Sequence, residues 1–194
     1  MTESDGVGRP ADSPAAFDGI DRLFLAGAAP DTVDDAVRQA VAGGVGHIVV
    51  LSSHGPEFEI NLPPEQWYWL TIERTVEASG TRWHHLRPSA ILASMLPEGC
   101  PYPGVSWAEI IRNDGVLRQP YTTAAIPHLD EDDLAALAAT VLTDHEHPDG
   151  VIDVAGPAVS TLDRVRTITE ILDTPIRFEQ LEPDQARQLW RGQG

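Results

Sequence analysis

Residues Ile20–Gly55, IDRLFLAGAAPDTVDDAVRQAVAGGVGHIVVLSSHG, predict a strand, a helix and a second strand in succession. Residues 22–26 are a short apolar run, and residues 47–53, HIVVLSS, form a continuous β-branched run typical of a strand buried on both faces. Between them we expect a helix, capped by Asp31 and ended by two glycines at 43 and 44. Its apolar side chains share one face at helical spacing: Val33, Ala36, Val37, Ala40 and Val41. The polar turn SSHG follows the second strand at its carboxyl end, where α/β sheets place ligands.

The rest of the chain continues this alternation. A helix is expected over residues 65–79, started by two prolines and ended by Gly80, and the strand RWHHLRP follows at residues 82–88. Further helices are expected at residues 106–114, after Asp130 as a cap, and after Ser160 as a cap; further strands are expected at residues 115–121, 150–157 and 175–181. Short connections of this kind favour parallel strands.

The predicted fold class is therefore α/β, with a truncated Rossmann-like, mostly parallel sheet flanked by helices and a small C-terminal substrate lobe. Residues 1–19 are rich in Gly, Pro, Ser and Asp, so we expect a flexible tail there. Residues 20–194 are expected to form a single domain, in which residues 20–88 make the sheet core and residues 89–194 make the substrate lobe and the remaining elements.

Charge and cysteine content exclude several classes of protein. Thirty acidic and thirteen basic residues leave a net charge of -17, which repels nucleic acids and anionic membranes. All the basic residues are Arg, so no mechanism that needs Lys is available. Cys100 is the single cysteine, which fits a cytoplasmic protein without an intrachain disulfide. We expect a small-molecule substrate as the partner, with no nucleic acid and no membrane.

Four motifs occur in an order that resembles a known family: VVLSSHG, ERTVEASGTRWHHLRP, LDEDDLAALAATVL and DVAGPAVSTLDRVRTITEIL. The chain resembles the NmrA-like group of atypical short-chain dehydrogenases/reductases over roughly residues 17–190. This resemblance implies a Rossmann-type sheet with a small substrate lobe, and usually NAD(P) binding.

Members of this family open with a strand and the phosphate-binding turn G-x-x-G-x-x-G, and neither is found here. The nearest candidate is GVGRPA at residues 6–11, but only five residues precede Gly6, and Pro10 and Pro14 interrupt the expected helix. We therefore expect no cofactor, no cofactor-binding residues and a sheet that starts at the family's fourth strand. The resemblance also places Trp69 where family members often carry the catalytic Lys, and Tyr68 one position out of the Tyr register.

Several polar residues still stand where the resemblance and the strand order predict the ligand edge. His54, Ser53, Glu57, Glu59 and His128 are the candidate catalytic residues, with His54 as the acid/base group assisted by a carboxylate. Arg87, Ser89, Tyr68, Trp69 and Ser94 are the candidate substrate-binding residues. The alternative for the SSHG turn is that its side chains only satisfy local backbone groups.

The remaining histidines suggest structural roles. His84 and His85 lie within a buried strand and are expected to be hydrogen-bonded core residues. His145 and His147 have metal-ligand spacing without a convincing third ligand, so no metal site is predicted.

The function ranked first from the sequence is a small-molecule enzyme that acts without a redox cofactor, by the acid/base chemistry of a cyclase, isomerase or dehydratase. One alternative is an NAD(P)-dependent oxidoreductase whose cofactor half is missing or supplied by a partner. The other is a non-catalytic ligand-binding or regulatory protein. Because a sheet that starts at the fourth strand exposes an unpaired edge, we also expect a homodimer formed through that edge.

Overall fold

The computed structural model describes residues 16–98, 106–144 and 148–192, which form two compact units. The first unit comprises the chain up to Ser89 together with Asp132–Val154, and the second comprises Ala90–Glu131 together with Ala155–Gly194. The boundary after Ser89 lies close to the expected end of the sheet core. The sequence did not indicate that residues 132–154 return to the first unit. The GVGRPA segment, Cys100, His145 and His147 lie outside the described residues.

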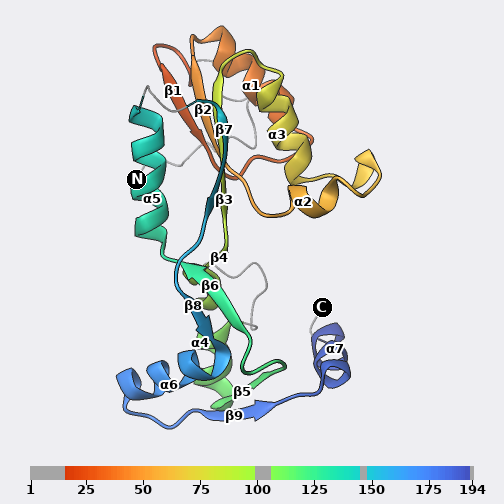
Figure 1. The fold of residues 1–194 in the computed structure, drawn as a ribbon, viewed down its shortest axis with the longest axis vertical. Coiled ribbons are helices and arrows are strands. Elements are labelled where there is room, and N and C mark those ends of the chain that lie inside the picture. The colour runs from red at the N-terminus through yellow and green to blue at the C-terminus, as the bar shows by residue number, and fades with distance from the viewer. Residues whose placement is uncertain (1–15, 99–105, 145–147, 193–194) are drawn as a thin grey trace. The chain divides into compact units, whose positions relative to one another are not determined.

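The first unit is built on a four-stranded parallel sheet (Figure 1). Its strand order is β1 (Arg22–Leu25), β2 (His47–Leu51), β3 (Arg82–Pro88) and β7 (Gly150–Val154). Helices α1 (Val33–Ala42) and α3 (Trp69–Glu77) lie together on one side of the sheet, and α5 (Glu131–Thr143) lies on the other. The mostly parallel α/β sheet flanked by helices is therefore confirmed.

The core of this unit lies between the sheet and the helices α1 and α3. Four successive residues of β2, His47–Val50, are buried, as expected for a strand covered on both faces. Leu25, Ile48 and Val76 are fully buried in this cluster. Phe17 joins it with 7% exposure, three residues before the expected start at Ile20. A Cβ on Gly43 would lie 2.7 Å from the Phe17 carbonyl oxygen, so glycine is needed where these segments meet.

Local hydrogen bonding changes the helix expected over residues 65–79. The segment instead contains a 3₁₀ helix, Pro64–Gln66, and then α3, which starts at Trp69. Glu59 explains this start, because its carboxylate accepts the backbone N–H groups of Trp69 and Leu70 at 3.2 and 2.7 Å. Glu59 itself ends a one-turn helix, α2 (Pro56–Glu59), which was not predicted from the sequence. At α1 the N-cap is Thr32, and its side chain makes no cap hydrogen bond, so the expected cap by Asp31 is wrong.

The second unit is made of smaller sheets. β4 (Ala90–Ile91), β6 (Ala125–Leu129) and β8 (Ala158–Ser160) form one sheet, and β5 (Val116–Gln119) pairs with β9 (Arg177–Gln180) in another. A 3₁₀ helix covers Leu92–Met95. The helices are α4 (Trp107–Asp114), α6 (Thr161–Leu172) and α7 (Pro183–Arg191). Ser160 caps α6 as predicted, since its Oγ accepts the N–H of Asp163. Strand β6 and helix α7 were not expected from the sequence.

Among the described residues, no helix is long and apolar enough to cross a membrane.

Candidate functional site

The carboxyl ends of β2 and β3 carry a buried polar network. Ser52 follows β2 directly and donates a 2.5 Å hydrogen bond from its Oγ to Glu73 Oε1, on α3. Arg87, near the end of β3, binds the same carboxylate with two hydrogen bonds, from Nε at 3.0 Å and from Nη2 at 2.7 Å. The Glu73 side chain is only 1% exposed and that of Arg87 is 14% exposed. This geometry is a bidentate, charge-assisted pair that fixes the ends of two strands to one helix.

Opposing effects set the charge state of Glu73. Burial by itself would raise the pKa of Glu73, but the hydrogen bonds from Arg87 and Ser52, together with the nearby charges, outweigh it and lower that pKa below its usual value. The hydrogen bonds to Glu73 also raise the pKa of Arg87. Glu73 therefore stays ionised at neutral pH and holds Arg87 in place, so Arg87 is already engaged by the protein.

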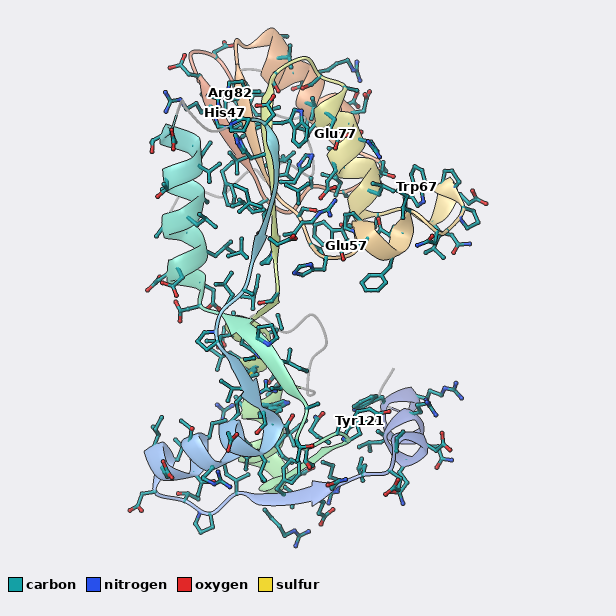
Figure 2. All side chains as sticks on the ribbon, viewed as in Figure 1. His47, Glu57, Trp67, Glu77, Arg82 and Tyr121 are labelled. Carbon is teal, nitrogen blue, oxygen red and sulfur yellow. The ribbon has the colours of Figure 1, made fainter. Side chains whose placement is uncertain are left out.

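His54 lies at the same edge, in a second and more exposed cluster. Its Nδ1 is 3.8 Å from Asp153 Oδ1, on β7, and its side chain is 39% exposed. Glu57 of α2, labelled in Figure 2, completes the group, and the nearest ligand atoms of these three side chains lie within 4.8 Å of one another. Glu57 also lies 3.9 Å from Arg87 Nη1. The cluster has the residue types of a metal site, and it also has those of an acid/base group beside carboxylates.

Other candidates in the first unit make local contacts. Ser53 Oγ accepts the N–H of Gly55 and so stabilises the turn after β2. Glu59 is engaged by the start of α3, and no hydrogen bond or ion pair joins it to His54 among the described residues. The Tyr68 hydroxyl donates to the Ala28 carbonyl at 3.3 Å, and its ring packs edge-on against Trp69 at 5.1 Å. Ser89 Oγ is buried without a hydrogen-bond partner, directly after β3.

The two strand histidines point to opposite faces of the sheet, as alternation requires. His84 is hydrogen-bonded in the core: its Nδ1 lies 2.9 Å from His47 Nε2, and its Nε2 lies 3.1 Å from the Pro148 carbonyl oxygen. Figure 2 shows His47 beside Arg82, at the end of the sheet opposite Glu57. Burial, and then the nearby His84, lower the pKa of His47.

His85 is also buried, but its ring nitrogens make no hydrogen bond within the described part of the chain. The ring stacks on Trp83 at 4.5 Å, and its Nε2 lies 3.5 Å from Glu77 Oε1, without hydrogen-bond geometry. Burial lowers the pKa of His85 in spite of the nearby charges of Glu73 and Glu77. The expectation of a hydrogen-bonded core histidine is thus met by His84 and not by His85.

The second unit contains the candidates His128 and Ser94. His128 is on β6, where its Nδ1 lies 3.1 Å from the Ile126 carbonyl oxygen and its Nε2 lies 2.7 Å from Arg164 Nη1, on α6. Because a guanidinium can only donate, Nε2 is the acceptor and Nδ1 carries the proton. Burial, and to a lesser extent the Arg164 charge, lower the pKa of His128. Ser94 Oγ donates to the Ile91 carbonyl.

A groove of about 590 Å³ lies between α1 and α3 in the first unit. Its lining includes Arg38, Trp67 and Arg74, and none of the edge residues named above contributes to it. Trp67 is held there by a hydrogen bond from its Nε1 to the Leu62 carbonyl. This groove is separate from the polar residues at the carboxyl edge of the sheet.

Sequence reasoning missed Glu73, Asp153 and Arg164. Glu73 falls on the buried face of its helix, three residues after Leu70 and three before Val76, and an acid at such a position needs a partner. That periodicity was a usable signal. Asp153 and Arg164 gave no comparable signal, because their partners come from distant segments of the chain.

Comparisons with known proteins point to reductases. A scan against protein-family models found no match. The chain is 32% identical over 180 residues to a (4-alkanoyl-5-oxo-2,5-dihydrofuran-3-yl)methyl phosphate reductase of Streptomyces griseus, covering 89% of this chain and 59% of that protein. It is 25% identical over 199 residues to an NAD(P)H azoreductase of Xenophilus azovorans, covering 100% of this chain and 66% of that protein. The chain therefore spans about three fifths to two thirds of the length of these relatives.

Solved structures show the same fold. The Citrobacter triphenylmethane reductase complexed with NADP(H) superposes with a TM-score of 0.71 at 16% identity, over 97% of this chain and 65% of that chain. A mutant NmrA superposes with a TM-score of 0.65 at 15% identity, over 90% of this chain and 57% of that chain. The resemblance to NmrA-like atypical short-chain dehydrogenases/reductases, inferred from the four motifs, is confirmed, as is the Rossmann-like fold.

These relatives correct the functional interpretation. The curated relatives are named as reductases, one of them NAD(P)H-dependent, and they contradict the cofactor-independent cyclase, isomerase or dehydratase ranked first from the sequence. The error came from treating the missing glycine-rich turn as the loss of redox chemistry. The oxidoreductase alternative fits the relatives better.

The described residues fit only part of a nicotinamide dinucleotide. Ser89 Oγ, buried and without a partner beside the engaged Arg87, is a free hydrogen-bonding group at the edge where such a cofactor's reactive end would lie. For the diphosphate there is no cradle within the described residues: the connection from β1 to α1 carries the single glycine Gly27, and the turn after β2 faces the carboxylates of Glu57 and Asp153.

Proposed function

We propose that this chain carries the catalytic edge and the substrate lobe of an NAD(P)H-dependent reductase of small unsaturated molecules. The observation that carries the proposal is the 32% identity to the furanone phosphate reductase over 180 residues, with the azoreductase in support. Their named substrates contain a conjugated lactone and an azo bond, which both accept two electrons and protons. Carbonyl-conjugated or azo compounds, including phosphate esters, are therefore the substrate class.

A reduction of this kind needs a hydride and a proton. The reduced nicotinamide would supply the hydride when it is bound. Ser89 would hold the nicotinamide end through its free hydroxyl.

His54 is the proposed proton donor. Its half-exposed side chain lies at the carboxyl edge of β2, and its Nδ1 is 3.8 Å from Asp153 Oδ1. A donor at this position gives its proton to the reduced atom of the substrate and recovers one from solvent, to which the side chain is open. Arg87 and Glu73 act as positioning residues, because their hydrogen bonds are made to each other and to Ser52.

Mixing the purified protein with NADPH and either an azo dye or an unsaturated lactone phosphate tests the proposal. We expect the absorbance of NADPH to fall only when an acceptor is present. His54→Gln should slow this oxidation by about a hundred-fold or more. Arg38→Gln, a change in the groove between α1 and α3, should leave it unchanged. If neither acceptor is reduced and calorimetry detects no binding of NADPH, the proposed function is wrong.

A further inference from the structure

Arg164 is a cation without a carboxylate partner in a strongly acidic protein. Four other arginines of the second unit, Arg118, Arg166, Arg177 and Arg187, each form an ion pair with a carboxylate. For Arg164 no carboxylate lies within ion-pair distance among the described residues, although the net charge is -17. Its charge is therefore uncompensated on α6.

Its contacts hold the guanidinium without neutralising it. The Arg164 Cζ atom lies 5.1 Å from the centre of the Trp107 ring, on α4, in a cation–π arrangement. Nη1 donates to His128 Nε2 at 2.7 Å, and Nη2 reaches Thr161 Oγ1 at 3.5 Å. His128 is neutral in this arrangement, because its Nδ1 proton is directed at the Ile126 carbonyl. The cluster as a whole therefore keeps one positive charge.

The hydrogen-bonding capacity of this guanidinium is only partly used. A guanidinium has five N–H groups, and in Arg164 two of the three nitrogens have an acceptor, while Nε is buried with no partner. The planar fork of Arg matches the oxygens of phosphate and carboxylate, and a Trp face behind it limits its freedom before a ligand arrives. A guanidinium that is fixed in orientation and has no paired carboxylate has the properties of an anion-binding group.

We propose that Arg164, supported by Trp107 and oriented by His128, binds the anionic group of the substrate, and that this group is a phosphate monoester. That the ligand is a substrate rests on the proposed reductase function. The inference adds which group of that substrate the protein recognises. Phosphate is favoured over carboxylate because a dianion gains more from a single uncompensated charge, and because several N–H groups are available for its oxygens.

Binding of methyl phosphate, measured without NADPH, tests the site independently of turnover. The full chain is titrated while the indole N–H signal of Trp107 and the backbone amides of α6 are followed by NMR. We expect saturable shifts with a dissociation constant on the order of millimolar, as for a small ion held by few contacts. Arg164→Gln should weaken this binding at least about tenfold, and the cation–π partner change Trp107→Leu should weaken it less.

Arg166→Gln is the matched control, because Arg166 is an exposed arginine two residues away on the same helix and is paired with Asp163 at 2.7 Å. It should bind methyl phosphate within about twofold of the wild type. If Arg164→Gln does not fold, Arg164→Lys replaces it: the charge remains and the fork is lost, so binding should fall by several-fold.

Equal affinities of the Arg164→Gln and Arg166→Gln proteins, or no saturable shift in the wild type, would overturn the anion site. Acetate binding as tightly as methyl phosphate would overturn the phosphate assignment. Phosphate binding that depends on Arg164, in a protein that does not oxidise NADPH, would leave the site standing while the reductase proposal fails.

Discussion

Replacing Glu73 with Gln is expected to destabilise the first unit by about 3 kcal/mol, because it removes one partner of a buried ion pair. Gln keeps the volume and one acceptor oxygen, so the main loss is the charge that faces Arg87. Removing one partner of such a pair usually lowers the free energy of unfolding by about 3–5 kcal/mol. We take the lower end because the Arg87 side chain is still 14% exposed, so water can solvate part of the guanidinium that remains.

Thermal unfolding followed by circular dichroism measures this loss. For a chain of this length, each kcal/mol shifts the melting temperature by about 2–4 °C, so the variant should melt about 6–12 °C below the wild type. Glu57→Gln is the matched control, since Glu57 lies 3.9 Å from the same guanidinium but its side chain is 54% exposed. An exposed pair of this kind is worth about 0–1 kcal/mol, so the control should melt within a few degrees of the wild type.

The pH dependence of the effect gives a second measurement. The pKa of Glu73 is lower in the folded protein than in the unfolded chain, so its stabilising contribution is present above the unfolded pKa and is lost as the pH falls through the folded pKa. The difference in melting temperature between the wild type and Glu73→Gln should therefore become smaller on acidification below about pH 4.3. Equal melting temperatures of the Glu73 and Glu57 variants at neutral pH would refute the buried pair as the source of stability.

Three further predictions concern packing, titration and assembly. A Cβ on Gly156 would lie 1.8 Å from the His128 carbonyl oxygen, so Gly156→Ala should lower the free energy of unfolding, measured in urea, by about 1–3 kcal/mol or more. The Cβ of Gly150→Ala meets nothing within 4 Å, so this control should lower it by less. Burial lowers the pKa of His85, so on acidification the unfolded chain takes up the proton first, and the stability of the fold decreases below about pH 6.5. In His85→Leu the melting temperature should depend less on pH in this range, and an unchanged pH dependence would contradict the prediction. Because β1 pairs only with β2 among the described strands, we also propose a homodimer through the other edge of β1, and light scattering that finds a monomer at micromolar concentration would contradict it.

The sequence by itself determined most of the helices and strands of the first unit and the class of fold. The β-branched run at residues 47–51 and the apolar face of the α1 helix encode their own burial, because local periodicity reflects which side of an element faces the core. Motif order also indicated the resemblance to NmrA-like reductases. Motif order did not lead to the right class of reaction, because the interpretation gave more weight to the absence of the glycine-rich turn than to the reductases that the motifs resemble.

Only the tertiary structure decided which polar groups meet. Glu73 and Arg87 are 14 residues apart, and Arg164 and His128 are 36 apart, so neither contact follows from a local pattern. Helix α3 starts at Trp69 because Glu59, ten residues earlier, folds back to cap it. Side-chain hydrogen bonds of this kind depend on the path of the whole chain, whereas the burial of an apolar face depends on the spacing of residues within one element.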